Sequence, residues 1–278
     1  MSFDPFVLSK TIKRALEEDI GNGDITTDSI VGVEEEVSAL IHAGEPGIIA
    51  GLPVAGAVFN MLDPDIVFSC HFSDGQRVEQ GQLLASVRGS GRSILKGERV
   101  ALNFIQRLSG IATQTSRLVN LVNQYKAKIV DTRKTTPGLR VLEKYAVRAG
   151  GGSNHRFGLF DAVLIKDNHL KVAGSISRAV ELVKASAPFT MKIEVEVEDL
   201  AGVAEALSAG VDIIMLDNMS VSEMSQAVEL VAGKVLLEAS GGITEQTVVS
   251  VAQTGVDLIS VGYLTHSAPS LDIGLELI

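Results

Sequence analysis

The chain has 278 residues, of which 46% are hydrophobic and 21% charged, proportions typical of a folded globular protein. Its formal net charge of −10 argues against general attraction to nucleic acid or anionic membranes, because both require a positive field. The single cysteine, Cys70, excludes an intramolecular disulfide and a cysteine-based metal cluster. With no signal-like or membrane-spanning apolar run, we expect a cytoplasmic protein with no membrane partner.

The length predicts two domains, or one α/β barrel with an attached region. The first third of the sequence is typical of mixed helices and strands separated by glycines. We expect helices at 5–18 and 53–61, strands at 37–42 and 66–72, and a hairpin at 74–84. Apolar residues at helical spacing then predict a helix from about 93 to 125, with Ser93 as its N-cap and a possible break at Gly110.

From residue 127 onward, short apolar strands alternate with amphipathic helices. We expect six strands, at 128–132, 162–166, 191–197, 211–217, 235–240 and 257–262. Each interval is long enough for a crossover helix, which indicates a parallel sheet. Such a sheet can be open, as in Rossmann-like folds, or closed into a barrel.

The strand expected at 191–197 favours the barrel. Its two-residue period places Lys192, Glu194, Glu196 and Glu198 on one face and aliphatic residues on the other. A central strand of an open sheet is covered by helices on both faces and is apolar throughout, whereas a barrel strand can turn a polar face inward. We therefore expect a barrel with a partly polar interior and an ion pair between Lys192 and Glu194, and leave the role of Glu238 open.

Every expected strand of this region ends in polar residues or glycine. In a β/α barrel these carboxyl ends share one face, where active sites are built. Arg133 and Lys134 follow the first strand, and His155 and Arg156 follow the glycine run at 150–152. Individually they suit surface salt bridges or loop charges, but together they predict a site for carboxylate or phosphate groups.

Lys166 ends the second strand of the barrel region. It can be an anion ligand, an ion-pair partner of Asp167 or a Schiff-base nucleophile, and we favour the anion ligand because nothing in the sequence lowers its pKa. His169 suits a structural hydrogen bond, since no second histidine lies at metal-ligand spacing from it.

Two carboxylates and several glycines end the later strands. Glu196 and Asp217 end consecutive strands, where their oxygens suit Mg²⁺ or sugar hydroxyls, or a barrel-lining salt bridge. Glycines at 241, 242 and 262 allow backbone N–H groups to approach phosphate closely.

The joined motifs resemble those of the quinolinate phosphoribosyltransferase family. The matching segments are EEDIGNGDITT at 17–27, ERVALN at 98–103, LSGIAT at 108–113, DTRKTTPG at 131–138, GGSNHR at 151–156, IKDNH at 165–169, EVE at 194–196 and SGG at 240–242. They extend over almost the whole chain and together are highly specific.

The resemblance implies an α/β fold with an N-terminal α/β sandwich domain, residues 1–112 joined by 267–278. It also implies an incomplete, seven-stranded β/α barrel at 113–266. Because only six strands are recognisable, we expect the seventh element to lie within 113–125. The family further implies a homodimer or a hexamer of dimers in which Arg99 enters the neighbouring subunit's site.

By the same resemblance, the site transfers phosphoribosyl from phosphoribosyl pyrophosphate to quinolinate, with loss of CO₂, in NAD biosynthesis. The implied catalytic residues are Lys134, Lys166, Glu196 and Asp217. The implied quinolinate ligands are Arg99, Thr132, Arg133, His155, Arg156 and Lys166. The implied phosphoribosyl pyrophosphate ligands are Lys134, His155, Glu196, Asp217, Ser240, Gly241, Gly242, Val261, Gly262 and Tyr263. Glu196 and Asp217 would also hold the Mg²⁺ cofactor.

Two other classes of function fit parts of the sequence. A lysine at the end of a barrel strand suits a Schiff-base lyase acting through Lys166. A catalytically silent phosphate-binding subunit fits the cations and glycines but leaves the carboxylates unexplained. The carboxylating transferase accounts for all three sets of residues.

Overall fold

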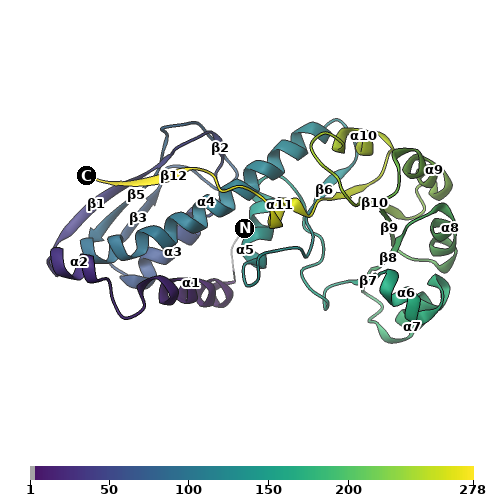
Figure 1. Ribbon diagram of the computed structural model, residues 1–278, viewed down its shortest axis with the longest axis horizontal. Helices are drawn as coiled ribbons and strands as arrows, with labels where there is room; N and C mark the ends of the chain where they lie inside the picture. The colour runs from purple at the N-terminus through teal and green to yellow at the C-terminus, as the bar shows by residue number, and fades with distance from the viewer. Residues whose placement is uncertain (1–3) are drawn as a thin grey trace. The chain divides into compact units, whose positions relative to one another are not determined.

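A computed structural model of the protein describes residues 4–278. The chain divides into two compact units (Figure 1). The first contains the residues up to Gln114 together with Thr136–Gly151 and Ser267–Ile278, and the second contains Thr115–Thr135 and Gly152–His266. Among the described residues, no helix is both long and apolar enough to cross a membrane.

The first unit is built on an antiparallel sheet with strand order β12-β1-β5-β3. Its strands are β1 (Glu36–Ala43), β3 (Val67–Cys70), β5 (Leu83–Ser90) and β12 (Ile273–Leu277), and β12 comes from the C-terminal end of the chain. Alternate residues of β1, namely Ala39, Ile41 and Ala43, are buried, as expected for a strand with one face in a core.

Helices accompany this sheet in the first unit. They are α1 (Pro5–Ile20), α2 (Ile25–Ile30), α3 (Leu52–Leu62), α4 (Gly91–Val122) and α5 (Arg140–Ala149). The long helix α4 is continuous, so the expected break at Gly110 is wrong. A Cβ at Gly110 would lie 1.9 Å from the Pro269 carbonyl oxygen, and glycine therefore allows the C-terminal segment to pack closely against α4. The division between the units falls within α4.

The hairpin expected at 74–84 does not form. Strand β4 (Arg77–Val78) pairs with β2 (Gly47–Ile48), while β5 pairs with β1 and β3 in the larger sheet. The tight turn is present, since Gln82 N donates to Glu79 O at 3.2 Å. Alternating apolar residues predict that two segments are extended, but they do not determine which strands pair.

The second unit contains the expected six-stranded parallel sheet, with order β6-β11-β10-β9-β8-β7. Its strands are β6 (Lys128–Val130), β7 (Val163–Ile165), β8 (Ile193–Val197), β9 (Ile213–Asp217), β10 (Leu236–Ser240) and β11 (Leu258–Ser260). Its helices are α6 (Asp167–Ala173), α7 (Ile176–Ser186), α8 (Leu200–Ala209), α9 (Val221–Val231), α10 (Val248–Gln253) and α11 (Tyr263–His266). The predicted N-terminal sandwich and incomplete barrel are therefore confirmed, with strands shorter than expected.

The seventh barrel element lies at Ser153, at the end of the glycine run. Ser153 forms a parallel bridge with Val130 of β6, and its N–H donates to Ile129 O at 2.9 Å. Residues 113–122, where we expected this element, instead continue α4. A single bridged residue has no strand periodicity, which is why sequence analysis did not find it.

The barrel interior is partly polar, as predicted. Glu194 on β8 and Glu238 on β10 have relative exposures of 3% and 0%. The expected ion pair between Lys192 and Glu194 is wrong, because Lys192 pairs with Asp212 and Glu194 pairs with His155. Lys192 precedes the first paired residue of β8 and is exposed, so it does not share the buried position of Glu194.

Candidate active site

The second unit contains a cavity of about 730 Å³ at the carboxyl ends of its strands. All of its lining residues belong to that unit. They include every predicted site residue except Arg99, namely Thr132, Arg133, Lys134, His155, Arg156, Lys166, Glu196, Asp217, Ser240, Gly241, Gly242, Val261, Gly262 and Tyr263. Arg99 lies on α4 in the first unit and is exposed, and its role stays a prediction.

A group of cations lines one part of this cavity. Arg156 is partly buried, and its Nη1 donates to Ala162 O at 3.1 Å, which holds the guanidinium in place. Burial and the neighbouring charge of Arg133 lower the pKa of Arg156 from its ordinary value. Two like charges held together in a partly buried site favour the binding of an anion between them. Lys134 follows in the loop after β6, where its N–H donates to Thr132 Oγ1 at 3.0 Å.

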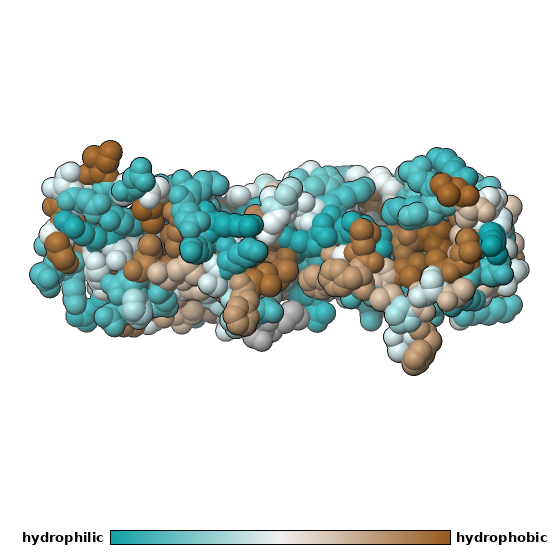
Figure 2. Space-filling model, turned by 90° about the horizontal axis from the view of Figure 1, so that it is seen from below, coloured by the Kyte–Doolittle hydropathy of each residue, from teal (hydrophilic) through white to brown (hydrophobic). Residues whose placement is uncertain are grey.

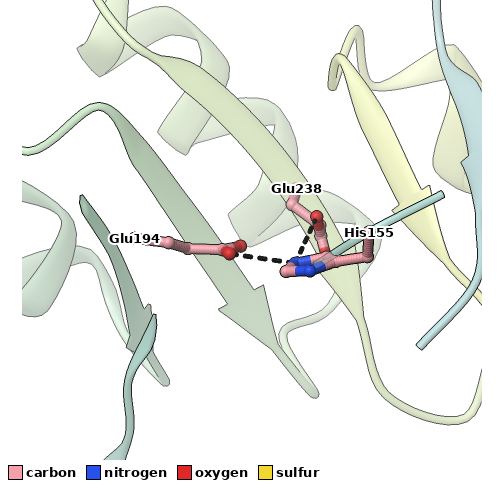
Figure 3. A group of neighbouring side chains, drawn as sticks. All are labelled: His155, Glu194 and Glu238. Atoms are coloured by element: carbon pink, nitrogen blue, oxygen red, sulfur yellow. Dashed lines mark ion pairs between the residues drawn. The ribbon is translucent and has the colours of Figure 1, made fainter. Parts of the chain in front are cut away.

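The segment that carries His155 is anchored by a buried carboxylate. Asp131, with a relative exposure of 0%, accepts hydrogen bonds from His155 N at 2.9 Å and from Asn154 Nδ2. The imidazole of His155 extends from there to the carboxylates of Glu194 and Glu238 inside the barrel (Figure 3). Asp131 therefore holds the backbone of this segment from the end of β6, at the point where the bridge at Ser153 forms.

Lys166 is positioned by the start of helix α6. Its N–H donates to His169 Nδ1 at 2.9 Å, which confirms the structural role expected for His169. Its Nζ lies 2.6 Å from Glu196 Oε2, whereas Asp167 pairs with Lys171. The alternative of an ion pair between Lys166 and Asp167 is therefore wrong, and Lys166 and Glu196 form a charged pair within the cavity.

The loops after β9 and β10 approach each other closely. Asn218 has a left-handed backbone with φ of 56°, and its N–H donates to Ser240 O at 3.0 Å. Its side-chain amide donates to Asp217 Oδ2 at 2.7 Å. Gly241 has a φ of 96°, and a Cβ there would lie 2.2 Å from Asn218 Oδ1. Glycine is therefore required at 241 both by the backbone conformation and by the approach of Asn218.

Several cavity residues were not identified from the sequence. They are Leu164, Met215, Asn218, Glu238, Ile243, Thr244, Ser260 and His266. Asn218 and Ser260 occur in strand ends that the sequence marks as polar, so position alone could have identified them. Glu238 points inward from a strand, and its two-residue spacing from Ser240 was the only sequence feature that indicated this orientation. Thr244 lies in the loop before α10 and His266 ends the short helix α11, positions where a polar residue has no distinctive pattern.

The fold and the cavity define a β/α-barrel enzyme with a site for an anionic substrate. The protein-family model of the quinolinate phosphoribosyl transferase N-terminal domain matches residues 24–109 of the sequence, and the family model of the C-terminal domain matches residues 111–276. The chain belongs to the quinolinate phosphoribosyltransferase family, whose members are pentosyltransferases.

Individual relatives support this assignment over the full length. The chain is 46% identical to the probable nicotinate-nucleotide pyrophosphorylase (carboxylating) of Bacillus subtilis, covering 97% of this chain and 93% of that protein. It is 45% identical to the nicotinate-nucleotide pyrophosphorylase (carboxylating) of Mycobacterium leprae, covering 96% of each. The crystal structure of NadC from Streptococcus pyogenes is 46% identical, with a TM-score of 0.95 and coverage of 100% and 99%.

Proposed function

We propose that this protein is a decarboxylating quinolinate phosphoribosyltransferase of NAD biosynthesis. It transfers phosphoribosyl from phosphoribosyl pyrophosphate to the ring nitrogen of quinolinate and gives nicotinate mononucleotide, pyrophosphate and CO₂. The observation that carries this proposal is that one cavity brings a group of cations together with the carboxylates Glu196 and Asp217, in a chain of this family. A dicarboxylate and a phosphorylated sugar need these two kinds of residue side by side.

The reaction requires one substitution and one decarboxylation. The ring nitrogen forms a bond to the anomeric carbon of the ribose, and the bond from that carbon to the pyrophosphate oxygen breaks. The quaternised ring then accepts the electron pair of the adjacent carbon–carboxylate bond as CO₂ leaves, and that ring carbon takes a proton. Positioning and electrostatic stabilisation account for both steps, so no enzyme nucleophile is needed.

The dicarboxylate subsite is assigned to the cationic part of the cavity. Arg133 and Arg156 provide guanidinium forks that match carboxylate geometry, and Lys166 provides a point charge. Thr132 and His155 border this subsite. Arg99 would complete it from the neighbouring subunit of a homodimer, or of a hexamer of dimers. An exposed arginine on α4 is compatible with that role.

The phosphoribosyl pyrophosphate subsite is assigned to the opposing loops. The proposed ligands are Lys134, Ser240, Gly241, Gly242, Val261, Gly262 and Tyr263, all of which line the cavity. His155, which the family resemblance also implies, borders this subsite, but its ring nitrogens contact Arg156 N and Glu194 and are not free to bind a phosphate. A Cβ at Gly242 would have no atom within 4 Å, so glycine leaves the backbone of that loop open to close approach by a phosphate. Glu196 and Asp217 would stabilise positive charge that develops on the ribose as pyrophosphate departs.

Glu196 and Asp217 also fit a magnesium ion by the chemistry of their donor atoms. Both are carboxylates at the cavity, and Mg²⁺ prefers oxygen ligands from one or two carboxylates together with substrate phosphates. When bound, Mg²⁺ would neutralise charge on the leaving pyrophosphate. The ion pair with Lys166 would then partly neutralise the negative charge that Glu196 presents to the ribose.

The proposed activity is tested by incubating the protein with quinolinate, phosphoribosyl pyrophosphate and Mg²⁺. We expect nicotinate mononucleotide and CO₂ in equal amounts, and absence of both products would reject the proposal. Lys166→Met should lower kcat/KM by about a thousandfold, because it removes a charge that contacts substrate. Lys171→Met is the matched control, since Lys171 is an exposed lysine of α6 paired with Asp167.

The shared site is tested by mixing two inactive variants. Arg99→Ala should abolish activity while each protomer stays folded, and Lys166→Ala should do the same from the other side of the site. Mixed dimers would contain one site with both residues intact, so we expect about a quarter of the activity to return after subunit exchange. No recovery after confirmed exchange would reject the shared site, and light scattering would separate dimer from hexamer.

A further inference from the structure

His155 has both ring nitrogens engaged in hydrogen bonds or ion pairs. Its Nδ1 accepts a hydrogen bond from the Arg156 N–H at 2.7 Å. Its Nε2 lies 2.9 Å from Glu194 Oε2 and 3.5 Å from Glu238 Oε2. Figure 3 shows the two carboxylates extending from their strands toward the same edge of the imidazole ring.

These contacts define the tautomer of His155. A ring nitrogen that accepts a backbone N–H carries no proton, because a protonated nitrogen can only donate. Nδ1 is therefore unprotonated, and the ring is neutral with its proton on Nε2. That proton is donated to Glu194, the closer of the two carboxylates.

The same observation argues against a metal ion among these three side chains, although their ligand atoms lie within 4.8 Å of one another. A histidine that binds a metal through Nε2 carries its proton on Nδ1 and usually donates it to a carboxylate or a carbonyl oxygen. Here Nδ1 faces a donor, the N–H of Arg156. The group is arranged for a proton on Nε2 and not for a cation.

A neutral His155 leaves two buried carboxylates with little to balance their charge. Glu194 Oε1 and both oxygens of Glu238 are buried and accept no hydrogen bond among the described residues. Burial and the neighbouring Glu194 raise the pKa of Glu238 to about 8, against a smaller opposite effect of His155. Two ionised carboxylates at this separation repel, so one proton held on Glu238 leaves a single negative charge.

The remaining negative charge, on Glu194, lies where it stabilises the positive charge of Arg156. Glu194 favours the charged form of Arg156, against the burial and the Arg133 charge that lower its pKa. Arg156 is also connected to His155 through its backbone N–H. The orientation of the His155 ring and the position of Arg156 are therefore linked through one hydrogen bond.

We propose that Glu194 and Glu238 are positioning residues that fix His155 as its neutral Nε2–H tautomer and thereby hold Arg156 in place for the carboxylates of the substrate. Neither glutamate touches the reacting atoms. Glu194 accepts the His155 proton, and Glu238 acts as a neutral carboxylic acid beside it. The effect on catalysis rests on the proposed function, whereas the tautomer can be measured without substrate.

The tautomer is tested by long-range ¹H–¹⁵N NMR of protein labelled with ¹⁵N-histidine. The chain has five histidines, and His155→Asn identifies the signals of His155. We expect the pattern of a neutral ring protonated at Nε2. A ring protonated at Nδ1, or at both nitrogens, would overturn the proposal. So would a stoichiometric metal ion in the purified protein that is lost in Glu238→Gln.

Variants then test the two glutamates separately. Glu238→Gln has the shape of a protonated glutamate, and we expect it to keep the Nε2–H pattern of His155, whereas loss of that pattern would reject a neutral Glu238. Glu194→Leu removes the acceptor and should raise that KM about tenfold, with a smaller change in kcat, because the ground-state ligand Arg156 is displaced. Glu229→Gln, an exposed substitution on α9, is the control.

Each outcome of this series is informative. If Glu194→Leu keeps both the NMR pattern and the KM, Glu194 does not position His155. If Glu194→Leu fails to fold, Glu194→Met keeps the volume and also removes the acceptor, and an unchanged KM together with an unchanged pattern would again reject the role. Absence of activity in the wild-type protein would reject the proposed function, while the NMR pattern would still decide the tautomer.

Discussion

Glu143 in the first unit and Glu238 in the second are both fully buried, but they are surrounded differently. Glu143 Oε1 accepts hydrogen bonds from Arg107 Nη2 at 2.8 Å and Nε at 3.2 Å, and its Oε2 accepts one from Thr136 N at 3.0 Å. Glu238 accepts no hydrogen bond among the described residues, and its carboxylate lies 3.5 Å from His155.

The difference separates a structural carboxylate from one that belongs to a site. A buried charge is tolerated where a partner and hydrogen bonds compensate its lost hydration, and Glu143 has both. Glu238 has only the more distant contact with His155 at 3.5 Å and a repelling neighbour in Glu194, and it keeps its proton more strongly, as its raised pKa indicates. It also lines the cavity, whereas Glu143 does not. Surface hydropathy does not reveal this distinction, because both glutamates are buried. The face drawn in Figure 2 shows mainly hydrophilic residues with scattered hydrophobic clusters.

The largest expected effect is the loss of stability when Glu143 is replaced. Glu143→Ala leaves the Arg107 guanidinium and the Thr136 N–H without their acceptor, and should lower the free energy of unfolding by about 3 kcal/mol. Urea denaturation followed by circular dichroism measures this loss. Glu181→Ala is the control, because Glu181 forms an exposed ion pair with Arg178. A loss below about 1 kcal/mol would show that the buried pair is not structural.

A smaller effect is expected at the cavity from the loop that contains Gly241. Gly241→Ala combines a left-handed backbone with a clash against Asn218, and should raise the KM for phosphoribosyl pyrophosphate by about tenfold. Gly233→Ala is the matched control, since Gly233 has a φ of 75° with open space around it. Equal KM values in the two variants would mean that the approach of Asn218 does not shape the phosphate loop.

Glu238 also predicts how stability depends on pH. Its pKa is raised from 4.5 in the unfolded chain to about 8 in the folded protein, so the folded state holds the additional proton. Its contribution to stability is present below about pH 4.5 and is lost as the pH rises through about 8, with a slope of at most about 1.4 kcal/mol per pH unit. Urea unfolding between pH 5 and 8 measures this loss of unfolding free energy, which should be smaller in Glu238→Gln than in the wild-type protein. Identical slopes would contradict a proton held on Glu238.

The smallest effect is expected from Glu238→Gln itself below about pH 4.5, where Glu238 is protonated in both the folded and the unfolded chain. Glutamine replaces a neutral carboxylic acid with little change in shape, so the free energy of unfolding should change by less than about 1 kcal/mol. The same substitution at Glu143 should cost considerably more, because it removes the charge that Arg107 pairs with. A comparable loss at both positions would remove the distinction between the two glutamates.

The sequence alone determined the strands of the barrel, the polar residues at their carboxyl ends and the family, because periodicity and motif spacing are local properties. It therefore identified the residues that line the cavity at strand ends, such as Lys166, Glu196 and Asp217. The tertiary structure decided which side chains meet. It paired Glu194 with His155, paired β4 with β2, and placed the seventh barrel element at Ser153. Each is a contact between segments distant in sequence, which local patterns do not determine.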